Sequence, residues 1–199
     1  MFHKHSGDPV LKWGTSLTRF KTELSECDNV FKGLKCYKNN FFGEHEMKIL
    51  DVLYKDAILA DLKALDKKGV LEELVTPVAR IAGINHEHLV RVLMERERLG
   101  STGIGDGIGI PHGKLKDLGS LVLGFGLSRK GVDFESMDGL PTHIFFLLIT
   151  PENSTGLHLK LLARISRILK NDPFKEKLLN AINSDEIYSI IKEEEEEEF

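Results

Sequence analysis

The sequence has few of the features that mark membrane, secreted or nucleic-acid-binding proteins. No apolar run approaches the ~18 residues that a membrane helix needs, and no apolar segment follows Lys4 as it would in a signal peptide. Two cysteines, Cys27 and Cys36, are too few for a disulfide framework in 199 residues and favour free thiols in a reducing cytoplasm. The net charge of −4 argues against a general nucleic-acid surface, which would be basic. We therefore expect a cytoplasmic chain of one domain with an appendage.

Several motifs of nucleotide-binding and hydrolytic enzymes are also missing. Gly103-x-Gly105 lacks the third glycine of a dinucleotide-binding fingerprint, because Ile108 stands in its place. The stretch from Gly109 to Gly113 is one residue short of a phosphate-binding P-loop, and no G-x-S-x-G motif is present. No HEXXH motif accompanies the histidines near position 86, which we interpret as a solvated first turn of a helix.

What the sequence does contain is an unusual density of glycine. Six of its 18 glycines lie between positions 100 and 113, and the run ends on His112, held between Pro111 and Gly113. Glycine lets another group approach the backbone closely, so we expect a flexible polar loop that presents an imidazole. A neutral imidazole near pH 7 is a nucleophile, and at its ordinary pKa of about 6.5 half the population is available. N–H groups of such a loop can bind phosphoryl oxygens.

This stretch resembles the active-site signature of the IIA domain of the bacterial phosphoenolpyruvate-dependent sugar phosphotransferase system, of the fructose/mannitol type that includes the nitrogen-regulatory IIA proteins. The resemblance runs from Met47 to about Lys192. The matching segments are Arg96-Glu97, Gly100-Ser101-Thr102-Gly103-Ile104-Gly105 and Gly107-Ile108-Gly109-Ile110-Pro111-His112-Gly113.

The resemblance assigns roles to three side chains. His112 would accept the phosphoryl group, Arg96 would neutralise it, and His158 would position it. A guanidinium suits the second role because it binds two phosphoryl oxygens and keeps its charge, and Arg98 is the alternative. The backbone that would bind the phosphoryl oxygens lies in the loop residues Ser101, Thr102, Gly103, Gly105, Gly107 and Gly109. His143 is interpreted as structural. Asp106 stands where many relatives have Asn, which argues against a phosphate cradle unless its carboxylate points to solvent.

The resemblance also implies a phosphotransferase that needs no metal, nucleotide or other cofactor. Phospho-HPr, a small histidine phosphocarrier, would donate to His112, and a IIB cysteine would receive the group for sugar uptake. The alternative is a nitrogen-type regulator, whose phosphorylation state controls its binding to target proteins. The sequence contains no segment resembling IIB and no membrane-inserted IIC segment, so those partners would be separate proteins. A more distant alternative is a metal-dependent hydrolase that uses His112 and His158.

The order of apolar and polar runs predicts an α/β fold. Helices and strands alternate loosely, which suggests a mixed sheet covered by helices, and the resemblance implies a roughly five-stranded sheet sandwiched between helices, the mannitol/fructose-type IIA fold. Glycines alternate with apolar residues in the strand 121–127, so we expect another element to pack closely on one face. The expected helices are 49–53, 66–81, 86–99, 158–170, 173–182 and 184–191; the other expected strands are 57–62 (an edge strand), 131–134 and 143–150, the last buried at the centre.

The two ends of the chain differ from the 47–192 domain. The six glutamates 193–198 and the terminal Phe199 form an acidic segment that we expect to be a solvated tail. Residues 1–46 show no regular hydrophobic period. One hypothesis is that they result from a misassigned start codon and that translation begins at Met47.

This hypothesis is testable by intact mass. Mass spectrometry of the protein isolated from its native source should give the mass of a chain that begins at Met47. A native N-terminus at Met1 would contradict it.

Overall fold

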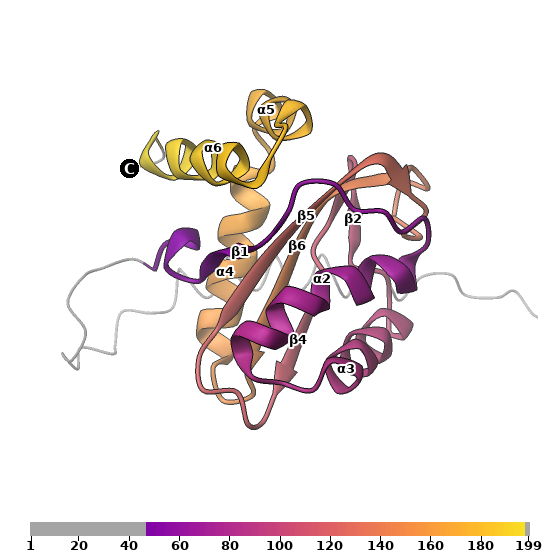
Figure 1. The fold of residues 1–199 in the computed structure, drawn as a ribbon, viewed down its shortest axis with the longest axis vertical. Coiled ribbons are helices and arrows are strands. Elements are labelled where there is room, and N and C mark those ends of the chain that lie inside the picture. The colour runs from indigo at the N-terminus through magenta and orange to yellow at the C-terminus, as the bar shows by residue number, and fades with distance from the viewer. Residues whose placement is uncertain (1–46, 198–199) are drawn as a thin grey trace, which may run out of the picture. The chain divides into compact units, whose positions relative to one another are not determined.

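The computed structural model describes residues 47–197 (Figure 1). The 1–46 extension, with Cys27 and Cys36, lies outside the described residues. No helix in the described part is long and apolar enough to cross a membrane. The elements in chain order are η1 (Ile49–Asp51), β1 (Leu53–Leu59), α2 (Lys67–Ala82), α3 (His86–Arg98), β2 (Gly103–Gly105), β3 (Ile108–Gly109), β4 (His112–Leu115), β5 (Val122–Val132), β6 (Thr142–Pro151), α4 (Thr155–Ile168), α5 (Asp172–Asn180) and α6 (Ser184–Glu197).

The strands form one mixed sheet in the order β1-β5-β6-β3-β2, and β4 also pairs with β6. Both β3 and β4 run parallel to β6, one after the other, so six strands occupy five positions. The remaining neighbours of the centre are β5, antiparallel to β6, and β1, parallel to β5. The predicted mixed sheet of about five strands between helices is therefore confirmed.

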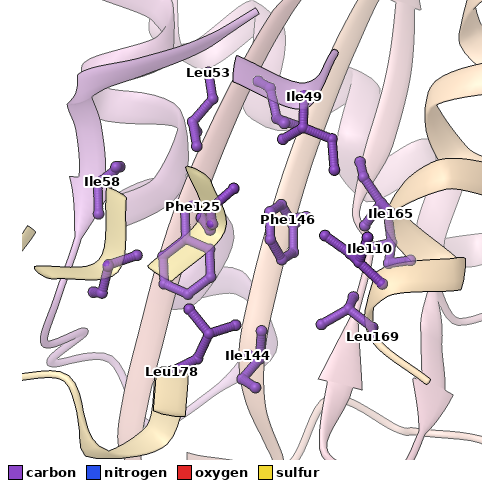
Figure 2. Close-up of a cluster of buried hydrophobic side chains, with 14 of the residues drawn as sticks. Ile49, Leu53, Ile58, Ile110, Phe125, Ile144, Phe146, Ile165, Leu169 and Leu178 are labelled. Carbon is purple, nitrogen blue, oxygen red and sulfur yellow. The ribbon is translucent and has the colours of Figure 1, made fainter. Parts of the chain in front are cut away.

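The two faces of the sheet carry separate hydrophobic clusters. Along β6, Ile144, Phe146 and Leu148 pack against α4, α5 and α6, the cluster shown in Figure 2. Their alternate neighbours in β6 face α2 and α3 instead. In Figure 1, α2 crosses in front of the strands and α4 lies on their far side. Because β6 is apolar on both faces, it lies at the centre, as its continuous hydrophobic run predicts.

The glycines of β5 allow α2 to approach the sheet. A Cβ placed on Gly126 would lie 2.6 Å from Leu74 of α2, and one on Gly124 would lie 2.8 Å from Val78. Both distances are too short for a real contact, so the strand needs glycine at these positions. The predicted close packing on one face of this strand is confirmed.

Capping residues begin and end the first two long helices as predicted. Asp66 accepts a hydrogen bond from Gly69 N at the start of α2, and Asn85 accepts one from His88 N at the start of α3. Gly83 ends α2 with a positive φ of 67°, which glycine adopts without strain. Helix α2 continues through Pro77.

Several predicted bounds were wrong. The edge strand is Leu53–Leu59 rather than 57–62, so the short helix before it is one 3₁₀ turn. β5 continues to Val132, which absorbs the separate strand expected at 131–134. Helix α4 begins at Thr155, three residues early, so His158 lies inside its first turn.

The glutamate-rich end is not a solvated tail over its whole length. Helix α6 continues to Glu197, and Glu194 and Glu195 are buried. The Glu195 carboxylate accepts hydrogen bonds from the backbone N–H groups of Ile49 (2.6 Å) and Leu50 (3.1 Å), and pairs with Arg164 Nε of α4 at 2.9 Å. The uniform charge of this segment concealed that one face of the helix is covered by η1 and α4.

Loss of the Glu195 carboxylate should therefore destabilise the fold. We expect Glu195→Ala to lower the free energy of unfolding in urea by about 3–5 kcal/mol, because it leaves the buried Arg164 guanidinium without this carboxylate. The matched control is Glu196→Ala on the exposed face of the same helix, with an expected change below about 0.5 kcal/mol. Equal stability of the two variants would contradict the prediction.

Candidate functional site

Three side chains from three elements meet at the edge of the sheet beside β4. Arg96 lies in the last turn of α3, His112 is the first residue of β4, and His158 lies in the first turn of α4. Arg96 Nε is 3.1 Å from His112 Nε2, and the His112 and His158 rings meet edge to face with centroids 5.3 Å apart. The structure thus brings together residues 16 and 46 positions apart in sequence, as the three candidate roles require.

The pairing of β4 with β6 directs His112 toward α4. His112 lies beside Leu148, which belongs to the cluster under α4, and paired residues of parallel strands share a face. The next residue, Gly113, faces the other way, where a Cβ would lie 3.2 Å from Val92 of α3. Among the described residues β4 pairs with β6 alone, so its outer edge is open and Arg96 reaches His112 around it.

One hydrogen bond determines which nitrogen of His112 carries the proton. Nδ1 lies 2.7 Å from the backbone carbonyl of Ile110. Because a carbonyl can only accept, Nδ1 carries the proton, and Nε2 presents its lone pair. Arg96 Nε donates to that lone pair, and Arg96 Nη1 donates to the Gly100 carbonyl at 3.0 Å.

Both histidines are held neutral. Burial, with the Arg96 guanidinium adding to it, lowers the pKa of His112 to about 3. Burial also lowers the pKa of His158 to about 4, with the charges of Lys114 and Arg96 acting in the same direction. The expectation that His112 has the ordinary imidazole pKa of about 6.5 was therefore wrong, because that value holds for a solvated imidazole.

The glycine run is a hairpin rather than a flexible loop. β2 and β3 pair antiparallel, and a Cβ on Gly103 or Gly109 would lie 3.0 Å or less from Ser136 or Phe145. Gly103 and Gly109 thus allow the hairpin to pack closely against Ser136 and Phe145. That the N–H groups of this run bind phosphoryl oxygens stays a prediction.

The side chains of Ser101 and Thr102, just before the hairpin, are also hydrogen-bonded to other parts of the protein. Ser101 Oγ donates to the Phe134 carbonyl at 2.8 Å, and Thr102 donates both its N–H and its hydroxyl to the Glu97 carboxylate. Their side chains therefore stabilise the segment that leads to His112.

Asp106 lies at the exposed turn of the hairpin. Its side chain is 74% exposed and pairs with Lys175 of α5, while its N–H donates to Asp138 at 2.7 Å. The Asp106 carboxylate is therefore exposed to solvent, which was the condition for its being compatible with a phosphate cradle.

Three further residues at the site were missed from the sequence. Lys114 projects to the same face of β4 as His112 and contacts Thr155 Oγ1 of α4 at 3.1 Å. Thr150, the partner of Lys114 in β6, lies 3.0 Å from His158 Nδ1. Glu97 binds Thr102. The alternation of a strand could have identified Lys114, two residues after His112, but the other two contacts depend on tertiary structure.

The other candidate residues do not join the site. Arg98, the alternative to Arg96, is exposed. His143 Nδ1 bonds the Ser128 carbonyl at 2.9 Å, which fits its structural interpretation. His86 Nε2 contacts the Glu72 carbonyl of α2. Within 47–197, no group of three or more His, Cys, Asp or Glu side chains could hold a metal ion.

Comparison with known proteins gives the family. Residues 51–194 match the family described as "Phosphoenolpyruvate-dependent sugar phosphotransferase system, EIIA 2". The chain belongs to this family. The residues resembling the IIA signature thus lie within a match that covers most of the described part of the chain.

Relatives of this IIA chain include regulators and a transport component. A nitrogen regulatory protein of Bradyrhizobium diazoefficiens is 41% identical over 73% of the chain and 95% of its own length. The fructose-specific EIIABC component of Bacillus subtilis is 36% identical over 74% of the chain, which spans 23% of that larger protein. The crystal structure of nitrogen regulatory protein IIA-Ntr from Neisseria meningitidis superimposes with a TM-score of 0.68 and 31% identity, over 71% of this chain and 97% of that one.

The lowered pKa values predict loss of stability in acid. As the pH falls below about 6.5, both imidazoles take up protons in the unfolded chain, but in the folded protein they do so only near pH 4 and 3. Acid therefore favours the unfolded chain, by up to about 1.4 kcal/mol per pH unit for each histidine.

Urea unfolding between pH 6.5 and 5 measures this effect. The free energy of unfolding should fall with pH, and His112→Gln should show a shallower fall because one of the two imidazoles is gone. Identical slopes for the variant and the unmodified chain would contradict the prediction.

Proposed function

We propose that the IIA chain accepts a phosphoryl group on Nε2 of His112 from a phosphohistidine carrier of the HPr type. The observation that carries this proposal is the Nδ1–Ile110 hydrogen bond of 2.7 Å, which leaves the Nε2 lone pair facing the Arg96 guanidinium. Membership in the phosphotransferase family supports it.

The transfer needs no proton to leave His112. The Nε2 lone pair attacks phosphorus, the bond between phosphorus and the donor nitrogen breaks, and the donor nitrogen keeps the electron pair. The Nδ1 proton stays on the bond to Ile110. Because the pKa of His112 is lowered to about 3, its nucleophilic form is fully populated at neutral pH.

Arg96 neutralises the charge of the phosphoryl group, and His158 positions the group. In the unphosphorylated protein Arg96 Nε occupies the lone pair, so the guanidinium must shift onto the phosphoryl oxygens as the new bond forms. His158 is oriented by Thr150, and its ring packs edge to face with the His112 ring from the α4 side. Lys114, exposed beside both rings, adds positive charge that favours the dianionic group.

The downstream role that the relatives favour is regulation. The nitrogen regulatory protein of Bradyrhizobium diazoefficiens is 41% identical to the chain, against 36% for the fructose-specific EIIABC component. Transport, with a IIB cysteine as acceptor, is the second candidate, and the match to the fructose-specific EIIABC component favours it. Both roles begin with phosphorylation of His112.

The first step is testable by intact mass. Incubation with Enzyme I, HPr and phosphoenolpyruvate should add one acid-labile phosphoryl group to the chain, and His112→Ala should add none. His143→Gln is the matched histidine control and should accept one. Phosphate on the His112→Ala chain would overturn the assignment of the acceptor.

The same reaction separates the two roles. A regulator should bind a target protein with an affinity that differs between the phosphorylated and unphosphorylated chains, and should lose its phosphoryl group slowly when a purified IIB protein is added. Rapid, complete transfer to a IIB cysteine would favour transport instead.

A further inference from the structure

A buried carboxylate lies directly beside Arg96 and has no part in the transfer just described. Glu97 is in the last turn of α3, and its side chain is 3% exposed. It accepts hydrogen bonds from the N–H of Thr102, at 3.1 Å, and from the Thr102 hydroxyl, and it lies 3.4 Å from Lys67 Nζ of α2. Burying a carboxylate costs free energy unless it is paired in this way, so the arrangement needs a reason.

Thr102 connects this carboxylate to the imidazole of His112. Thr102 is fully buried, and its carbonyl accepts a hydrogen bond from Ile110 N at 3.0 Å. The Ile110 carbonyl in turn accepts from His112 Nδ1 at 2.7 Å. Thr102 therefore holds Ile110, whose carbonyl orients the acceptor ring and fixes its tautomer.

The same carboxylate also holds the segment that orients Arg96. The chain from Glu97 to Thr102 contains Gly100, whose N–H bonds the Glu97 carbonyl at 3.0 Å. The Gly100 carbonyl accepts from Arg96 Nη1 at 3.0 Å. Because the Glu97 side chain binds Thr102, it closes this turn and fixes the carbonyl against which the guanidinium rests.

We propose that Glu97 is a positioning residue that acts through Thr102 to set Arg96 and His112 against each other. One carboxylate controls both partners of the 3.1 Å contact between Arg96 Nε and His112 Nε2. The inference rests on the proposed role of His112 as phosphoryl acceptor. Phosphoryl transfer depends on placement, and a misplacement of about 1 Å costs up to ~100-fold in rate.

Lys67 makes the buried charge tolerable. Its ammonium group lies between the carboxylates of Glu97 and Glu135 (2.9 Å), over the ring of Phe134 at 5.0 Å, and its side chain is 13% exposed. It thereby connects the start of α2 and the 134–136 segment to the end of α3. Loss of the negative charge at Glu97 would leave Lys67 with the exposed Glu135 carboxylate.

The chain offers a matched control for Glu97. Glu195 is also a buried glutamate that accepts backbone N–H groups and pairs with a cation, but it binds η1 and α4 rather than Thr102. Glu97→Gln and Glu195→Gln therefore remove the same charge from similar surroundings. Thr102→Val removes the hydroxyl at nearly constant shape, and Thr102→Ser retains it.

The rate of phosphoryl transfer from phospho-HPr, measured over a range of donor concentrations, tests the proposal. We expect Glu97→Gln and Thr102→Val to lower kcat by roughly 10–100-fold with an unchanged KM, because the donor still docks on the same surface. Glu195→Gln should keep kcat within about twofold of the unmodified chain, and Thr102→Ser, which retains the hydroxyl, should restore most of the kcat that Thr102→Val loses. If Glu97→Gln does not fold, Thr102→Val decides the outcome.

A second measurement needs no phosphate. The ¹⁵N resonance of His112 Nε2 in the unphosphorylated chain reports the hydrogen bond from Arg96, and it should shift in Glu97→Gln and Thr102→Val but not in Glu195→Gln. Equal kcat values for the two glutamate variants, or an unshifted resonance in Glu97→Gln, would overturn the proposal. If the unmodified chain takes up no phosphate, the proposed function fails, and the resonance still decides whether Glu97 positions the pair.

Discussion

The parallel pairing of β4 with β6 is the contact on which the site depends. It fixes His112 beside Leu148 on the face that α4 covers, at an edge of the sheet that remains open among the described residues. Helix α4 follows β6 directly along the chain, so the same central strand that holds β4 also brings His158 against the His112 ring. Arg96 arrives from the opposite face because Gly113 lets α3 pack closely beneath β4. A rigid sheet edge between two helices can thus hold three side chains in register.

Two kinds of buried titratable group differ in charge: glutamates that are charged and paired, and imidazoles that are neutral. Elsewhere in the fold two buried glutamates are paired with cations, Glu97 with Lys67 and Glu195 with Arg164. At the site itself both imidazoles are kept neutral by burial, because charging either would place a second cation beside Arg96. The surrounding ion pairs fix the backbone, and the neutral rings keep a lone pair available. This division suits a phosphoryl acceptor, which needs a nucleophile and nearby positive charge at once.

Patterns within one element were informative about the fold. The apolar run of β6, the glycines of β5 and the caps Asp66, Asn85 and Gly83 depend on neighbours in sequence, and each of these predictions was confirmed. The errors occurred where a distant segment changed the outcome. The glutamates at the end of α6 read as a tail because the sequence does not show that η1 and Arg164 cover one face of that helix.

For the candidate site too, some features follow from local sequence and others depend on tertiary contacts. By itself the sequence determined which side chains are candidates for the site, since His112 stands between Pro111 and Gly113, after a glycine run and after an arginine at the end of a predicted helix. Tertiary structure decided which nitrogen of His112 is unprotonated, how far its pKa falls, and that Glu97, Lys114 and Thr150 belong to the site. The reason is physical: residue types follow from local chemistry, whereas burial, tautomer and hydrogen-bond partners depend on groups that meet only when α3, β4, β6 and α4 have packed together.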